Sequence, residues 1–317
     1  MKKILTQLPV RTSNPRENGL TMMMDKGLSF RQAEDFLASN IEHTDIIKLG
    51  FGTSIITPNV ANKIRLYQDN GMMVYAGGTL FEAFAIRKQL DDYKKYMEDI
   101  GLNMVEISDG SMHMEHDAKC EIISDFAKDF KVISEVGSKD ASVEISSENW
   151  LKWMQNELSS GSWKVIAEAR EGGNVGICND DGGIKSELID EITNKISIDK
   201  ILWESPNKNQ QIWFINKFGA NVNLGNISLL LSLPLVKGTT QKVHILSQPL
   251  VMETNAVTPF PPNLTGLMSA YVSSNDKITL IAFFPSSTSF IRFGKSLYAS
   301  GPTTISTNFS SSKNLAF

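Results

Sequence analysis

Cysteine is scarce in this chain, which has two cysteines, Cys120 and Cys178, among its 317 residues. They share no short spacing, so we expect no disulfide framework, and a reducing compartment suits the chain. Long apolar runs are also missing, because even residues 227–236 fall far short of the roughly 20 residues that a membrane-spanning helix needs. The N-terminus has two lysines but no sustained apolar segment. We therefore expect no signal peptide and a cytoplasmic protein.

An excess of positive charge is missing as well. The formal net charge is −4, with 21% charged and 41% hydrophobic residues. Proteins that bind nucleic acids or anionic membranes broadly usually carry a basic surface. We therefore expect neither partner, and the composition is otherwise that of a globular protein with a sizeable core.

The chain does contain eight short apolar runs, most of which end in a charged or amide side chain beside glycine. They lie at residues 20–27, 45–53, 72–79, 103–110, 132–139, 165–173, 201–204 and 221–226. Helical patterns separate many of them, at 29–37, 81–98, 115–130, 147–158, 187–196 and 210–218. Buried parallel strands explain the apolar runs, and a barrel explains their polar ends, because its strands all end at one mouth. We predict an α/β fold, a (β/α)8 TIM barrel formed by residues 1–227.

The composition changes after Ile227. Residues 228–317 contain six basic and two acidic side chains, a charge of +4, which leaves −8 for residues 1–227. This segment is rich in Ser and Thr, and no helix with a clear apolar face follows the eighth run. We predict that 228–317 is a divergent, poorly ordered segment that replaces the usual eighth helix. Part of Ser228–Leu235 is expected to cover the outer face of the barrel there.

The predicted mouth gathers many charged residues. They are Asp25, Lys26, Lys48, Glu106, Asp109, Glu135, Lys139, Glu168, Arg170, Glu171 and Glu204. Carboxylates suit Mg²⁺, and the cations suit an anionic substrate or a developing enolate. Glycine pairs such as Gly77–Gly78 let backbone N–H groups approach a phosphate closely. Together these features indicate a small, multiply charged substrate and a divalent metal.

Each of these features also has a structural interpretation. A single Glu at a strand end forms a structural ion pair about as readily as it takes part in catalysis, so the prediction depends on the whole set. A glycine pair is commonly only a turn. His113 and His116 have a spacing that can hold a transition metal, but a surface loop is the better interpretation. A nucleophilic Cys178 is the weaker of its two interpretations.

Taken together, the polar strand ends resemble those of the phosphosulfolactate synthase family over about residues 6–227. The matching motifs are Asp25-Lys-Gly27, Lys48-Leu-Gly-Phe-Gly-Thr53, Gly77-Gly-Thr-Leu-Phe-Glu82, Glu106-Ile-Ser-Asp-Gly-Ser111, Glu135-Val-Gly-Ser-Lys139, Glu168-Ala-Arg-Glu171 and Asn221-Val-Asn-Leu-Gly-Asn-Ile227. The resemblance implies a (β/α)8 lyase that adds sulfite to phosphoenolpyruvate with Mg²⁺, giving phosphosulfolactate on the route to coenzyme M. Plant heat-stress-associated proteins and bacterial members outside that route also belong to the family. The alternative is therefore a non-catalytic, stress-associated or protein-binding barrel.

Residue roles follow from this resemblance and from the strand-end chemistry. We assign Lys139, Lys48 and Arg170 to catalysis, with Lys139 stabilising charge or donating a proton. We assign Gly78, Thr79, Ser108, Asn223 and Gly225 to substrate binding. We assign Asp25, Glu106, Glu135 and Glu168 to Mg²⁺. We expect Lys48, Glu106, Glu135, Glu168, Glu204 and Asn223 to converge on one face, and the protein to be a homo-oligomer that binds phosphoenolpyruvate and sulfite.

Limited proteolysis tests the predicted division of the chain. Because residues 228–317 lack the strand–helix alternation that precedes them, a protease should trim them and leave a core of residues 1 to about 235. Mass spectrometry of the digest measures the boundary. A resistant segment that unfolds together with the barrel in one transition would contradict the prediction.

Overall fold

The computed structural model describes residues 9–140 and 142–229, and the backbone of three strands between 267 and 293. Contacts divide the chain into two units, Met1–Gln241 and Lys242–Phe317. None of the described helices is long and apolar enough to cross a membrane.

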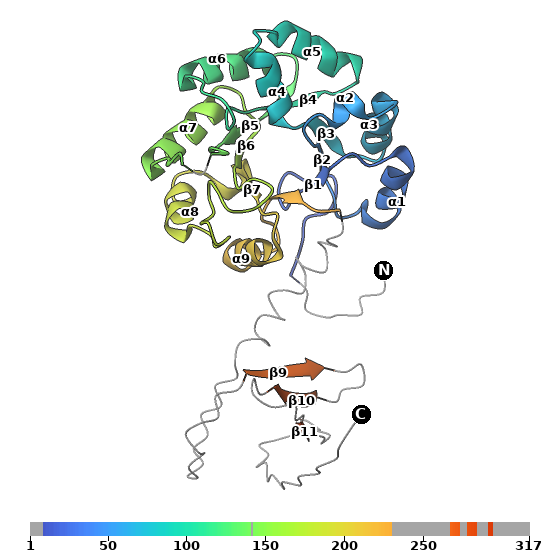
Figure 1. The fold of residues 1–317 in the computed structure, drawn as a ribbon, viewed down its shortest axis with the longest axis vertical. Helices are drawn as coiled ribbons and strands as arrows, with labels where there is room; N and C mark the ends of the chain where they lie inside the picture. Colours follow the sequence, from blue (N-terminus) through green and yellow to red (C-terminus); the bar gives the residue numbers. More distant parts are fainter. Residues whose placement is uncertain (1–8, 141, 230–266, 273–277, 284–290, 294–317) are drawn as a thin grey trace. The chain divides into compact units, whose positions relative to one another are not determined.

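Eight parallel strands form the first unit, one in each of the eight predicted runs. They are β1 (Thr21–Asp25), β2 (Ile46–Leu49), β3 (Met73–Ala76), β4 (Met104–Ile107), β5 (Lys131–Val136), β6 (Lys164–Ala167), β7 (Ile201–Glu204) and β8 (Leu224–Ile227). Their order in the sheet is β3-β2-β1-β8-β7-β6-β5-β4, and β1 pairs with β8. Helices surround this ring in Figure 1. The predicted TIM barrel is therefore confirmed.

The barrel has a seam between β3 and β4, the two ends of this order. The described residues show no ladder of backbone hydrogen bonds there. Side chains bridge it instead, because the N–H of Gly78 donates to Glu106 Oε1 at 2.9 Å. Glu82 also crosses the seam, accepting hydrogen bonds from the Ser108 hydroxyl and the Ser111 N–H.

The helices lie between the strands as expected, with two differences. They are α1 (Phe30–Asn40), α2 (Thr53–Ile56), α3 (Val60–Asp69), α4 (Gly78–Ala85), α5 (Leu90–Asp99), α6 (His116–Phe126), α7 (Ser147–Ser159), α8 (Ser186–Thr193), the 3₁₀ helix η1 (Ile198–Lys200) and α9 (Lys208–Phe218). Ser29 caps α1 in a capping box with Gln32. The sequence patterns had not singled out α2, α3 or η1.

The predicted helix at 81–98 is in fact two helices, α4 and α5. Lys88 adopts a left-handed conformation, with φ of 58°, and the next residue donates its N–H back to Phe84 O. This stop usually uses glycine, which the sequence does not have here. The apolar periodicity of residues 81–98 therefore continues through the break between α4 and α5, so the sequence pattern did not reveal that break.

Buried apolar layers position the strands. Inside the barrel, one cluster contains Leu20, Met22, Ile46, Tyr75, Met104, Ile133, Ile166 and Leu202. Gly225 leaves room for this layer, because a Cβ there would lie 3.0 Å from Met22 Cε and 3.4 Å from Leu202 Cδ2. Outside, the helices pack on the strands through two larger clusters. The strands are therefore buried on both faces, which explains their nearly continuous apolar sequences.

The second unit contains an antiparallel sheet in the order β11-β10-β9. Its strands are β9 (Leu267–Val272), β10 (Ile278–Phe283) and β11 (Ile291–Phe293). Of the segment expected to cover the outer face of the barrel, Leu229 packs against the cluster that includes Met23 and Phe36. Residues 230–266 lie outside the described part, so the missing eighth helix and the poorly ordered segment stay predictions.

Candidate active site

Lys48, on β2, reaches across the C-terminal end of the barrel to three carboxylates. Its Nζ lies 3.0 Å from Glu106 Oε2, 3.4 Å from Glu204 Oε1 and 3.5 Å from Glu135 Oε2. Only 8% of its side chain is exposed. Burial opposes its charge, but Glu106 and then Glu204 hold the pKa of Lys48 well above its ordinary value. Lys48 is therefore a permanent, buried cation.

Lys139, in the loop after β5, is a second cation enclosed by carboxylates. Its Nζ lies 2.8 Å from Glu135 Oε1, 3.6 Å from Glu82 Oε1 and 3.7 Å from Glu168 Oε2. Burial opposes this charge too, but Glu135 and Glu168 raise the pKa of Lys139. Its side chain is 21% exposed, so this ammonium group is the more accessible of the two.

The environment shifts the pKa values of Glu135 and Glu168 in opposite directions. Burial opposes ionisation of Glu135, but Lys139 and Lys48 lower its pKa far below the usual range. Burial, reinforced by the charges of Glu135 and Glu204, raises the pKa of Glu168 well above its ordinary value. Burial likewise raises the pKa of Glu106 to about 7. The pKa values of two neighbouring carboxyl groups are therefore shifted in opposite directions, which is the arrangement that general acid–base chemistry uses.

Three of these carboxylates form a possible metal site. Oxygens of Glu135, Glu168 and Glu204 all lie within 4.8 Å of one another, and all three side chains are buried. Glu168 Oε2 has no hydrogen-bond donor among the described residues. An all-oxygen set of this size fits a hard cation such as Mg²⁺. Glu204 is the member that was not assigned to metal binding from the sequence, although it ends the seventh apolar run.

Asp25 lies outside this group, and its oxygens are already used. Oδ1 accepts the N–H groups of Gly27 and Leu28 at 2.8 and 2.7 Å. Oδ2 lies 3.1 Å from the Tyr67 hydroxyl and 2.9 Å from the buried Lys63 Nζ. The structure therefore places Asp25 in a network that ties β1 to α3, and its role as a metal ligand stays a prediction.

The residues assigned to substrate binding are dispersed. Gly78 lies at the seam, where a Cβ would come within 2.3 Å of Ser108 Oγ. Thr79 follows it in α4 and is half-buried. Gly225 lies in the packed interior of the barrel.

Asn223 does not join the cluster at the mouth. It precedes β8, and its side chain accepts from Leu20 N and donates to Asp199 O and Ile201 O. These groups mark the amino-terminal end of the barrel. Lys48, Glu106, Glu135, Glu168 and Glu204 do converge at the opposite end, as expected.

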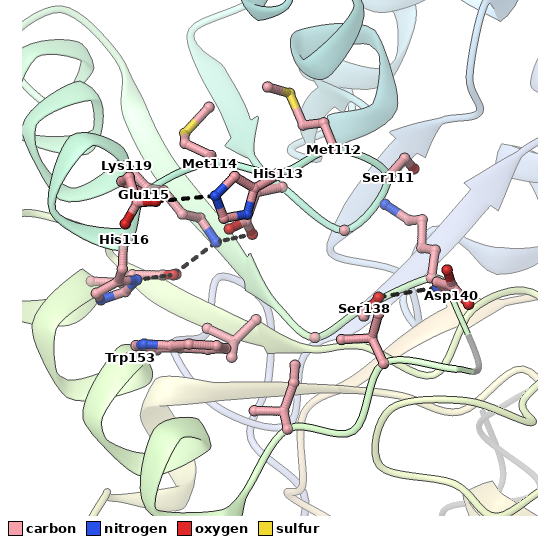
Figure 2. A pocket seen from close by; sticks show the side chains of 18 of the residues that line it. Ser111, Met112, His113, Met114, Glu115, His116, Lys119, Ser138, Asp140 and Trp153 are labelled. Atoms are coloured by element: carbon pink, nitrogen blue, oxygen red, sulfur yellow. Dashed lines mark hydrogen bonds and ion pairs between the residues drawn. The ribbon is translucent and has the colours of Figure 1, made fainter.

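A cavity of about 940 Å³ opens beside Lys139, between the loops that follow β4 and β5 (Figure 2). Arg170 also lines it. The guanidinium of this exposed residue donates to Lys139 O at 3.3 Å, and its backbone has a φ of 58°. Lys139 and Arg170 therefore present positive charge to an anion in this cavity.

Another part of the cavity wall is a network of ion pairs and hydrogen bonds around the buried Lys119. Lys119 Nζ contacts Asp109 Oδ1 at 2.7 Å, Glu157 Oε1 at 2.8 Å and Glu135 O at 2.6 Å. This network ties α6 and α7 to the end of β5. His116 stacks on Trp153 (Figure 2), and their ring centroids are 5.6 Å apart.

For His113 and Cys178, the structure supports a structural role rather than metal binding or nucleophilic catalysis. His113 is exposed and bonds to Glu115 at 3.0 Å in the β4–α6 loop, and it forms no metal group with His116 among the described residues. Burial raises the pKa of Cys178 to about 12, so its thiol is neutral and poorly nucleophilic.

Comparison with known proteins matches residues 9–233 to a family described as (2R)-phospho-3-sulfolactate synthase. Three relatives are each named phosphosulfolactate synthase. That of Bacillus subtilis is 38% identical over 230 residues, covering 72% of this chain and 91% of the relative. That of Methanothermobacter thermautotrophicus is 36% identical, covering 69% and 87%. That of Methanocaldococcus jannaschii is 37% identical, covering 67% and 87%.

Glu157 should make stability depend on pH. Burial raises its pKa to about 7 from 4.5, so between these values the folded protein holds a proton that the unfolded chain releases. This contribution is complete below pH 4.5 and is lost as pH rises to about 7, and its size is about 3 kcal/mol. Denaturant unfolding of wild type and Glu157→Gln across this range measures their free energies of unfolding. As pH rises, the wild type should lose stability relative to Glu157→Gln, so any advantage that it has at low pH should shrink or reverse. Parallel curves would contradict the prediction, and Glu148→Gln, an exposed change on the same helix, is the control.

Proposed function

Because the chain belongs to the (2R)-phospho-3-sulfolactate synthase family, we propose that it is a lyase that adds sulfite to phosphoenolpyruvate to form phosphosulfolactate. The family match and the three relatives support this activity. The observation in the site that carries it is the pairing of two buried lysines with a cluster of glutamates at the C-terminal end of the barrel. A barrel that served only as a scaffold would gain nothing from burying so many charges.

The reaction forms one bond and moves one proton. The lone pair of the sulfite sulfur attacks C3 of phosphoenolpyruvate, and the electrons of the C2–C3 double bond move onto the carboxylate. That group becomes a dianion, and protonation of C2 then restores the carboxylate. The site must therefore stabilise a growing negative charge and supply one proton.

Lys139 has the properties that both tasks require. It is a charged ammonium group at neutral pH, it lines the cavity, and it lies at the edge of the buried cluster. Arg170, on the same cavity, is placed to bind an anionic group of the substrate. Lys48 is almost fully enclosed, so it fixes the orientation of Glu106, Glu135 and Glu204 and partly neutralises them.

The carboxylates fit Mg²⁺. The cluster contains more carboxylates than ammonium groups, so its net charge stays negative even when one or two carboxylates are protonated. Two lysines face Glu82, Glu106, Glu135, Glu168 and Glu204. Glu135, Glu168 and Glu204 would hold the ion, which would supply electrostatic stabilisation for the substrate's carboxylate. Glu168 must lose its proton to bind a metal, so metal affinity should rise with pH.

Several finer parts of this proposal come from the family resemblance and the composition. They are a place on the route to coenzyme M, a cytoplasmic location and a homo-oligomeric state. No observation of the described fold or site favours the non-catalytic alternative. The buried lysines and glutamates support a catalytic role instead.

The direct test is an assay with phosphoenolpyruvate, sulfite and Mg²⁺, following phosphosulfolactate by phosphorus NMR. Lys139→Ala should lower kcat by about 10²-fold or more, a loss comparable to that of one oxyanion donor. Lys139→Arg keeps the charge and should retain more activity. Lys128→Ala removes an exposed lysine and is the control. Wild-type turnover by folded Lys139→Ala would remove this role, and no turnover by wild type would overturn the proposed function.

A second test concerns the metal. Calorimetric titration should show Mg²⁺ binding that strengthens with pH in the wild type and weakens in Glu168→Gln and Glu204→Gln, because each loses an anionic oxygen. Glu148→Gln is again the control. Undiminished turnover in excess chelator would show that the proposed ion is not required.

A further inference from the structure

An exposed ion pair joins two loops across the rim of the barrel mouth. Lys26 follows β1, Glu171 follows β6, and Lys26 Nζ lies 2.5 Å from Glu171 Oε2. In the sheet order, β8 and β7 lie between β1 and β6. The shorter way round the barrel between the two loops therefore runs over the C-terminal ends of β8 and β7, the part of a TIM barrel where phosphate groups commonly bind.

The cations at the mouth differ in how completely their charge is already neutralised. Lys48 and Lys139 each lie within 4 Å of three buried carboxylates. Within the described part of the chain, Lys26 has one carboxylate partner, Glu171, and the two side chains are 63% and 57% exposed. Ion pairs this exposed contribute little to stability, so exchanging the partner costs little.

The buried cluster also creates an electrostatic problem for the proposed substrate. Phosphoenolpyruvate carries a phosphate and a carboxylate, and the glutamates at the mouth repel both. An incoming anion needs positive charge that is exposed at the rim, where charge also speeds association. The β6–α8 loop supplies Arg170 toward the β5 side, through its bond to Lys139 O. Lys26 supplies a cation on the β1 side, and its ammonium group is paired with the carboxylate of Glu171.

We propose that Lys26 binds the phosphate of the substrate and that Glu171 is a placeholder which this phosphate displaces. The inference rests on the proposed function, because it takes phosphoenolpyruvate as the substrate. A dianionic phosphate makes stronger charge-assisted hydrogen bonds to an ammonium group than an exposed carboxylate does. The exchange therefore favours the bound state, while Glu171 keeps the Lys26 side chain directed over the mouth in the free enzyme.

This role predicts opposite consequences for the two partners of the pair. Lys26→Ala removes a substrate contact and should raise KM for phosphoenolpyruvate about 10-fold or more, with kcat within about 2-fold. Lys26→Arg should restore most of the affinity. Glu171→Gln removes the competing anion and should leave KM unchanged or lower it. If the pair only fastened the two loops together, losing either partner would impair the enzyme in the same way.

The matched control is Lys95→Ala, which breaks an ion pair with Asp99 whose side chains are 73% and 57% exposed on α5. It should change neither KM nor kcat. Thermal midpoints of all four variants verify that they are folded. Equal impairment by Lys26→Ala and Glu171→Gln, or a wild-type KM in Lys26→Ala, would overturn the proposal.

Direct binding separates this inference from the reaction itself. Calorimetric titration with phosphoenolpyruvate and Mg²⁺, without sulfite, should show weaker binding to Lys26→Ala and equal or tighter binding to Glu171→Gln. If this pattern appears but the wild type gives no product with sulfite, the anion site stands and the proposed reaction fails. If the wild type forms product but Lys26→Ala binds phosphoenolpyruvate as tightly as the wild type, the proposed reaction stands and the role of Lys26 fails. A wild type that does not bind phosphoenolpyruvate would overturn the role of Lys26 as well.

Discussion

Glu135 holds two ammonium groups at once, those of Lys48 and Lys139, at the buried C-terminal end of the barrel. The site depends on this shared carboxylate because it links the two buried cations: it is the nearest ion-pair partner of Lys139, while Glu106 and Glu204 also keep Lys48 charged. It also drives the pKa values of Glu135 and Glu168 in opposite directions. The lysines keep the proton off Glu135, while the resulting negative charge helps to keep one on Glu168.

The same side chains that build the site also help to close the barrel. Between β3 and β4, Glu106 accepts the Gly78 N–H and also pairs with Lys48, so a structural hydrogen bond and a site ion pair share one carboxyl group. Glu82 similarly connects Ser108 and Ser111 to Lys139. Fold and electrostatics are therefore coupled at this seam, and a change in either is transmitted to the other.

Positive charge at the mouth is graded from the interior to the rim. The innermost cation, Lys48, is enclosed and serves to organise carboxylates. Lys139 lies at the boundary between the cluster and the cavity. Arg170 and Lys26 are exposed, and their partners are a backbone carbonyl and an exposed carboxylate. Such a gradient allows an anion to be drawn in by exchangeable charges before it reaches those that would act on it.

The sequence by itself determined the barrel and most of its mouth, because buried parallel strands need apolar runs and end at one face. It could not show that Asp25 would be used up by Lys63 and backbone N–H groups, or that Asn223 would lie at the opposite end of the barrel. It placed Glu204 at the mouth with Glu135 and Glu168, but could not show that these three carboxylates come close enough to share a metal ion. Tertiary structure decided these points, because strand register and side-chain reach fix which charges meet, and periodicity in the sequence records only the face on which a residue lies.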